Sequence, residues 1–181
     1  MKRLKTRTSP GLLFDALAFA AHKHRAQRRK DKEASPYINH PIALAEVLVR
    51  EGRVTDAEIL AAALLHDTLE DTRTTAEELQ QAFGERVVGI VEEVTDNKSL
   101  RKATRKRQQI EHARHMSREA KLVKIADKIC NLRDVAERPP KGWPLARRRE
   151  YFDWARQVVD RMRGASRRLA VAFDAAYRQR P

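Results

Sequence analysis

The stretch Ala62-Ala-Leu-Leu-His-Asp-Thr-Leu-Glu-Asp71 changes character halfway along its length. Its first half consists of alanine and leucine, as in a helix inside a core, and its second half carries one histidine and three acids. On a helix, positions i, i+1, i+4 and i+5 cover adjoining stripes of one side, and these positions hold His66, Asp67, Glu70 and Asp71. Neighbouring carboxylates near a core repel one another unless a cation compensates them. The stretch therefore predicts a metal site at the end of a buried helix. The alternative is a solvated helix end whose acids follow the capping pattern.

The chain around this stretch has helical periodicity. Apolar residues recur three and four apart, and no alternating pattern indicates strands. Thr55 and Glu58 form a T-x-x-E capping box that opens a helix running to about Asp71, and Thr75 with Glu78 repeats the signal. Further helices are expected over residues 11–26, 42–52, 85–95, about 108–115, 117–137 and 145–177, the last with a break near Gly164. The sequence predicts an all-α fold of seven to ten helices.

Two more polar positions stand beside apolar helical segments. Pro41 suits the first position of a helix and disfavours the α conformation in the residue before it. This predicts that His40 lies just outside the helix, at its N-terminal end. Asp127 and Asn131 stand four apart within residues 121–132, so they share one helix face. Asp127 is a candidate metal ligand, and Asn131 a candidate contact to a substrate hydroxyl or phosphate. The alternative for Asp127 is a surface ion pair with a neighbouring lysine.

Together these positions offer two imidazoles and two carboxylates, from His40, His66, Asp67 and Asp127. Mixed nitrogen and oxygen ligands suit Mn²⁺ or Fe²⁺, and also Zn²⁺, with positions left for water. Such an ion lowers the pKa of bound water and neutralises phosphate charge. The set therefore predicts hydrolysis of a phosphate ester.

Composition fits this interpretation. The 181 residues are enough for one domain, residues 11–181, after a loose basic arm, residues 1–10. Thirty-eight Lys and Arg against 25 Asp and Glu give a net charge of +13, which attracts polyanions such as nucleotides, nucleic acid or anionic lipid. Cys130 is the only cysteine, so we expect a reducing, cytoplasmic location. No stretch approaches the about 20 apolar residues of a membrane span, so no membrane partner is expected.

Four blocks of sequence occur in a characteristic order: the basic loop with Arg29 and Lys30, Tyr37-Ile-Asn-His-Pro41, His66-Asp-x-x-Glu-Asp71 and Lys124-Ile-Ala-Asp-Lys-x-x-Asn-Leu132. In this order they resemble the HD-domain (p)ppGpp hydrolases of RelA/SpoT-type proteins, and most of all the stand-alone small alarmone hydrolases of the metazoan SpoT homologue type. The resemblance extends over nearly the whole chain, from about residue 12 to about residue 180. It implies an all-α HD fold and hydrolysis of the 3′-diphosphate of ppGpp or pppGpp, which gives GDP or GTP and pyrophosphate and degrades the signal of the stringent response.

The resemblance also implies a role for each matching residue. One Mn²⁺ per chain, or another divalent ion, is bound by His40, His66, Asp67 and Asp127. Glu70 and Asp71 position or activate the attacking water and manage the proton on the leaving 3′-oxygen. The residues implied in binding the nucleotide are Arg29, Lys30, Tyr37 and Asn131, with Arg147 and Tyr151 at the phosphate end.

Two other functions remain open at this stage. The first is an HD phosphohydrolase that acts on another 3′- or 2′-phosphorylated nucleotide, such as NADPH, with the same residues. The second is a basic helical protein that binds nucleic acid through residues 25–32, 101–107 and 147–149. Only 6% of the residues are aromatic and few lie among the basic runs, which argues against nucleic acid as the partner. A homo-oligomer also stays open.

Overall fold

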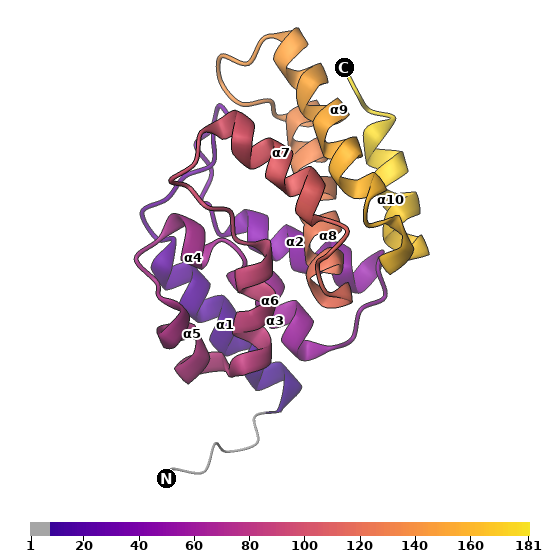
Figure 1. Ribbon diagram of the computed structural model, residues 1–181. Helices are drawn as coiled ribbons and strands as arrows, with labels where there is room; N and C mark the ends of the chain where they lie inside the picture. Colours follow the sequence, from indigo (N-terminus) through magenta and orange to yellow (C-terminus); the bar gives the residue numbers. More distant parts are fainter. Residues whose placement is uncertain (1–7) are drawn as a thin grey trace.

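Helices form every regular element within residues 8–181, the part of the chain that the computed structural model describes (Figure 1). Within that part, extended pairing is limited to one isolated bridge between Arg28 and Pro36. In chain order the elements are α1 (Ser9–Lys23), α2 (Asn39–Arg50), α3 (Ala57–Leu65), α4 (Thr68–Asp71), α5 (Ala76–Phe83), α6 (Glu85–Val94), α7 (Lys102–His112), α8 (Arg118–Glu137), α9 (Leu145–Asp160), a 3-10 helix (Arg163–Ala165) and α10 (Arg167–Tyr177). The prediction of an all-α fold is confirmed.

The core is built around α3 and α8. Every residue of α3 from Ile59 to Leu65 is buried, and its alanines let α1, α2 and α6 pack closely against it. Helix α8 buries twelve of its twenty residues and packs against α2, α6, α9 and α10. In Figure 1, α8 stands between the first six helices and the pair α9 and α10. Side chains of α8 can therefore share a site with residues from the first half of the chain.

The predicted helix starts are partly right. Thr75 caps α5 and Ser117 caps α8, each by accepting a hydrogen bond from the backbone N–H three residues on, as the sequence indicates. The N-cap of α3, however, is Asp56 rather than Thr55. Its carboxylate accepts from the N–H groups two and three residues on, because it stands one residue closer to these free donors.

Helix α2 begins earlier than expected, so the prediction that His40 lies outside a helix is wrong. The N–H of Asn39 donates to the carbonyl of Pro36, and that of His40 donates to Tyr37. These bonds wind the chain into the helix before Pro41, which stands within the first turn, where its missing N–H costs no helical hydrogen bond. His40 thereby lies in the first turn of α2, with its ring buried.

Two expectations about the basic segments need correction. Of the arm predicted over residues 1–10, Ser9 and Pro10 belong to α1, which Thr8 caps, and residues 1–7 lie outside the described residues. The helix expected over about residues 108–115 begins earlier, inside the basic run, because α7 spans Lys102–His112. This helix buries none of its residues.

The apolar residues are divided among many short helices. Within residues 8–181, no helix is both long and apolar enough to cross a bilayer. The large apolar side chains that are exposed in this part of the chain stand on several different helices: Phe14, Ile42, Val49, Leu145 and Val171. Single exposed apolar residues are common on protein surfaces and define no interface by themselves.

Candidate active site

Residues 62–71 fold as parts of two helices with a break between them. Helix α3 ends at Leu65 and α4 begins at Thr68, so the prediction of one helix running to Asp71 is wrong. The hydroxyl of Thr68 donates to the carbonyl oxygen of Leu65 at 2.6 Å, in place of a helical N–H. Adjacent residues on a regular helix do not face each other. At this break, in contrast, His66 Nε2 lies 2.9 Å from Asp67 Oδ2.

Side chains from three helical regions converge on this break. One nitrogen each from His40 and His66 and one oxygen from Asp67 lie within 4.8 Å of one another. Asp127, in the middle of α8, joins this group through His40, whose Nε2 is 3.2 Å from Asp127 Oδ1. All four residues line one cavity of about 180 Å³. The two histidines are only 4% and 5% exposed, so the group is a buried polar cluster rather than a solvated helix end.

The cluster fits a divalent cation. His66 Nδ1 lies 2.8 Å from the carbonyl oxygen of Ala63, which can only accept, so Nδ1 is protonated and the ring is held with Nε2 toward the cluster, where a bound ion would take the place of a proton. Within the described residues, His66 Nε2 is buried and has no hydrogen-bond partner. Two ligand atoms about 2.1 Å from an ion and at right angles are about 3 Å apart. The two donor pairs, at 2.9 and 3.2 Å, have this spacing.

The charges of the cluster depend on one another. Burial disfavours a charged imidazole, but the carboxylates of Asp67 and Asp127 outweigh it and raise the pKa of His66 to about 9. Burial likewise opposes a charged Asp67, yet His66 and His40 hold the pKa of this carboxyl below its usual range. Asp67 also accepts a hydrogen bond from the Tyr37 hydroxyl. These buried acids are ionised only because positive partners surround them, a role that a metal ion also fills.

Glu70 and Asp71 lie on α4, next to the cluster. Glu70 Oε2 accepts from the backbone N–H of Asp96 at 3.1 Å, and Oε1 is 3.8 Å from Lys98 Nζ. Asp71 is held from two sides, by Lys98 at Oδ1 and by Gln27 Nε2 at Oδ2, the latter at 2.7 Å. Burial and the charges of neighbouring acids raise the pKa of Glu70. Both carboxylates line a second cavity, of about 450 Å³.

A series of hydrogen-bonded side chains connects the cluster with the basic loop. Asn131 Nδ2 donates to Asp127 Oδ1 at 2.6 Å, and Asn131 Oδ1 accepts from Arg29 at 3.4 Å. Arg29 also donates to Asp134, and its guanidinium lies 5.7 Å from the centre of the Tyr37 ring. An amide and a guanidinium next to an aromatic ring are suited to contact a nucleobase or a phosphate.

The outer end of the site is basic and aromatic. A third cavity, of about 410 Å³, shares Lys30 and Tyr151 with the second and is lined by five cations, from Lys30, Lys102, Arg105, Lys106 and Arg147. The Arg147 guanidinium lies 4.3 Å from the centre of the Trp143 ring. Burial and the charges of neighbouring cations lower the pKa of Lys102. The three cavities adjoin one another through shared lining residues and are together called the cleft, and every site residue that the sequence predicts lines one of them.

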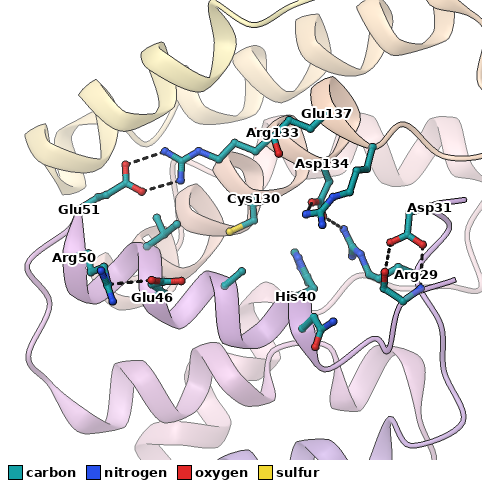
Figure 2. A pocket seen from close by; sticks show the side chains of 15 residues that line it. Arg29, Asp31, His40, Glu46, Arg50, Glu51, Cys130, Arg133, Asp134 and Glu137 are labelled. Atoms are coloured by element: carbon teal, nitrogen blue, oxygen red, sulfur yellow. Dashed lines mark hydrogen bonds and ion pairs between the residues drawn. The ribbon is translucent and has the colours of Figure 1, made fainter. Parts of the chain in front are cut away.

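A further cavity of about 410 Å³ shares Arg29 and His40 with the cleft and is lined mostly by residues of α2 and α8 (Figure 2). Charged side chains in its wall pair with each other: Arg133 donates to both oxygens of Glu51 at 2.7 and 2.9 Å. Cys130 lies in this wall, 6% exposed, and burial raises the pKa of its thiol to about 12. Cys130 is therefore a small residue that faces the core.

Several residues of the cleft were not predicted, among them three that hold proposed site residues. Asp134, which pairs with Arg29, could have been found, because it stands at i+7 from Asp127 on the same face of α8 as Asn131. Gln27 and Lys98, which hold Asp71, carry no such signal. They lie outside the helices, and only the fold brings them to α4.

Comparison with known proteins agrees with this geometry. The family model described as an HD domain matches residues 16–153. The guanosine-3′,5′-bis(diphosphate) 3′-pyrophosphohydrolase MESH1 of Danio rerio is 57% identical over 159 residues, which is 88% of each chain. The human protein of that name is 54% identical over 93% of this chain and 94% of its own.

Structural similarity extends over the same length. A solved structure, described as a metazoan orthologue of SpoT that hydrolyses ppGpp and has a role in starvation responses, has a TM-score of 0.91. It is 48% identical in sequence and covers 97% of this chain and 98% of its own. The chain therefore belongs to the HD-domain family, in the branch that contains the MESH1 pyrophosphohydrolases.

Proposed function

We propose that this protein hydrolyses the 3′-diphosphate of ppGpp or pppGpp and releases pyrophosphate with GDP or GTP. The observation that carries the proposal is the convergence of two histidines and two aspartates on the break between α3 and α4, at one end of a cation-lined cleft. The names of the relatives support the choice of substrate. We also propose a cytoplasmic location, in keeping with a lone buried cysteine.

The residues that would hold the metal are His40, His66, Asp67 and Asp127. A divalent ion there, which we propose to be Mn²⁺, would lower the pKa of a bound water and neutralise charge on the phosphate. The Ala63 carbonyl fixes the ring of His66, and Asn131 and Lys128 fix the carboxylate of Asp127 by hydrogen bonds of 2.6 and 3.0 Å. Fixed donors lose little entropy when the ion binds.

Glu70 and Asp71 are the proposed catalytic acids. The raised pKa of Glu70 suits a group that takes a proton from the attacking water near neutral pH. Asp71, one residue further, is held between Gln27 and Lys98, and we assign to it the proton on the leaving 3′-oxygen. The proton that Glu70 takes from the water passes through the Asp71 carboxylate to the leaving oxygen, which keeps the electron pair of the broken P–O bond, while the water supplies its oxygen to phosphorus.

The remaining contacts are proposed for the nucleotide. Arg29, Tyr37 and Asn131 line the cleft between the metal cluster and its opening, where a base or ribose would lie. Lys30, Arg147 and Tyr151 line the outer cavity, where cations would bind the phosphates at the other end of the substrate.

The direct test is to incubate the purified protein with ppGpp, with and without Mn²⁺, and to identify the products by anion-exchange chromatography. We expect GDP and pyrophosphate in equal amounts, only with the metal. Release of single phosphate from ppGpp would contradict the proposed bond cleavage. Faster turnover of NADPH in the same assay would instead favour another phosphorylated nucleotide as substrate. Binding of RNA at physiological salt without any hydrolysis would favour the nucleic-acid alternative.

A further inference from the structure

A chain of hydrogen bonds leads from a buried histidine to the cleft. His24 follows α1 and is 2% exposed. Its Nδ1 lies 2.7 Å from Gln27 Oε1, and Gln27 Nε2 lies 2.7 Å from Asp71 Oδ2. The core end of the chain is thus fixed by packing, whereas its other end is a carboxylate that lines the cleft.

The direction of each bond in this chain follows from the one before it. An ionised carboxylate only accepts, so the NH₂ group of Gln27 has to face Asp71. The amide oxygen then faces His24 and accepts, which places the imidazole proton on Nδ1. A histidine with its proton on Nδ1 therefore selects the one amide orientation that donates to Asp71.

Stability alone does not explain why a histidine occupies this position. His24 Nε2 is buried and has no hydrogen-bond partner within residues 8–181. A buried polar atom without a partner costs free energy that an apolar side chain would not. The feature that only a donor supplies is the bond from Nδ1 to Gln27.

The turn that His24 and Gln27 form, in which the Gln27 N–H donates to the His24 carbonyl, also contacts the metal cluster. The His24 ring packs on Tyr37, with 4.8 Å between ring centres and 33° between ring planes. The backbone carbonyl of Gln27 accepts from the N–H of Tyr37 at 3.2 Å, and the Tyr37 hydroxyl donates to Asp67. One turn thus contacts a carboxylate of the cluster through Tyr37 and a proposed catalytic carboxylate through Gln27.

We infer that His24 and Gln27 are positioning residues, which orient the Asp71 carboxylate toward the leaving oxygen during hydrolysis. The inference rests on the proposed function of Asp71. Lys98 binds the other oxygen of Asp71, but its side chain is 48% exposed, whereas His24 is 2% exposed. The buried chain from His24 therefore supplies the fixed orientation.

Two substitutions at His24 distinguish the effect of losing the hydrogen-bond donor from the effect of losing the aromatic ring. His24→Phe keeps a ring against Tyr37 and removes the donor, and we expect kcat to fall about 10-fold with unchanged metal content. His24→Asn places an amide N–H near the position of Nδ1 and removes the ring, and we expect kcat within about 3-fold of the wild type. The reverse order of the two activities would overturn the inference. The matched controls are His22→Phe and His22→Asn, on the exposed surface of the same segment, which should leave kcat unchanged.

A double-variant cycle tests whether Gln27 acts through Asp71. Gln27→Met keeps the side-chain length without the amide and should lower kcat about 10-fold, with KM and metal content unchanged. In an Asp71→Asn background the same substitution should cause no further loss, because its target is already altered. An equal loss in both backgrounds would show that Gln27 does not act through Asp71, and unchanged kcat in Gln27→Met would overturn its role altogether.

A spectroscopic measurement tests the chain without any substrate. The ¹⁵N chemical shifts of the His24 ring should show a proton on Nδ1 in the wild type, and Gln27→Met should shift that nitrogen. A proton on Nε2 alone would contradict the inference, whatever the enzyme hydrolyses. Conversely, the predicted shifts together with no hydrolysis of ppGpp would leave the chain in place and refute the proposed function instead.

Discussion

The two ends of the cleft are built in opposite ways. At the inner end, buried histidines from α2 and from the break after α3 meet acids from that break and from α8 in a cavity of about 180 Å³. At the outer end, α7 and α9 contribute lysine, arginine and aromatic side chains to a cavity of about 410 Å³. Helix α8 buries twelve of its twenty residues, whereas α7 buries none of its eleven.

The difference follows from the cost of removing charge from water. The inner acids are buried, so their partners are fixed: Asp127 contacts His40, Lys128 and Asn131 within 3.2 Å. The outer cations stay near solvent and need no such partners. We therefore expect the inner end to control metal binding and kcat, and the outer end to control KM.

The largest effect should come from removing an inner ligand. Asp127→Ala should lower kcat by about 10³-fold or more, because metal binding and water activation are both lost. Metal content, measured by elemental analysis, should fall with activity. The matched control is Glu137→Ala, an exposed acid on the same helix. Wild-type activity and metal content in Asp127→Ala would show that α8 contributes no ligand to the metal.

Glu70→Gln should have the next largest effect. The amide keeps the size of the side chain but cannot take a proton, so kcat should fall about 10²-fold while bound metal is retained. Glu92→Gln on the exposed face of α6 serves as the control. If Glu70→Gln lost the metal instead, Glu70 would belong to the metal ligands rather than to proton transfer.

A smaller effect is expected at the outer end. Lys30→Ala should raise KM about 5- to 10-fold with kcat changed by less than 2-fold, since an exposed cation contributes ground-state binding of about 1 kcal/mol. Initial rates over a range of ppGpp concentrations measure both constants. Lys32→Ala, two residues away and exposed, should change neither. A fall in kcat without a change in KM would contradict the division between the two ends.

The smallest effect should come from salt. Raising KCl from about 0.1 to 0.5 M shortens the screening length about twofold, so KM should rise about 3- to 5-fold through the outer cations. The buried inner end is screened less, and kcat should stay constant. The Lys30→Ala variant should have a weaker salt dependence of KM than the wild type. A salt-dependent kcat would show that charge steering also acts on the chemical step.

Local patterns predicted much of the fold. Capping residues such as Thr75 and Ser117 mark helix starts because the hydrogen bond they make spans three residues. The break at His66 and Asp67 was missed, because the alanine-rich run before it and the acids after it both suit a helix. The hydrogen bond from Thr68 to Leu65 is also local, but it competes with helical bonds that the sequence supports equally well.

The sequence by itself determined the helical class, the chemistry of the donor set and the family to which the chain belongs, because these depend on residue types at short spacings. Only the tertiary structure decided that α8 carries Asp127 to His40, that Lys98 and Gln27 hold Asp71, and that α7 closes a basic cavity. Such contacts join residues separated by 27 to 87 positions, and the packing of the core, not any local pattern, brings them together.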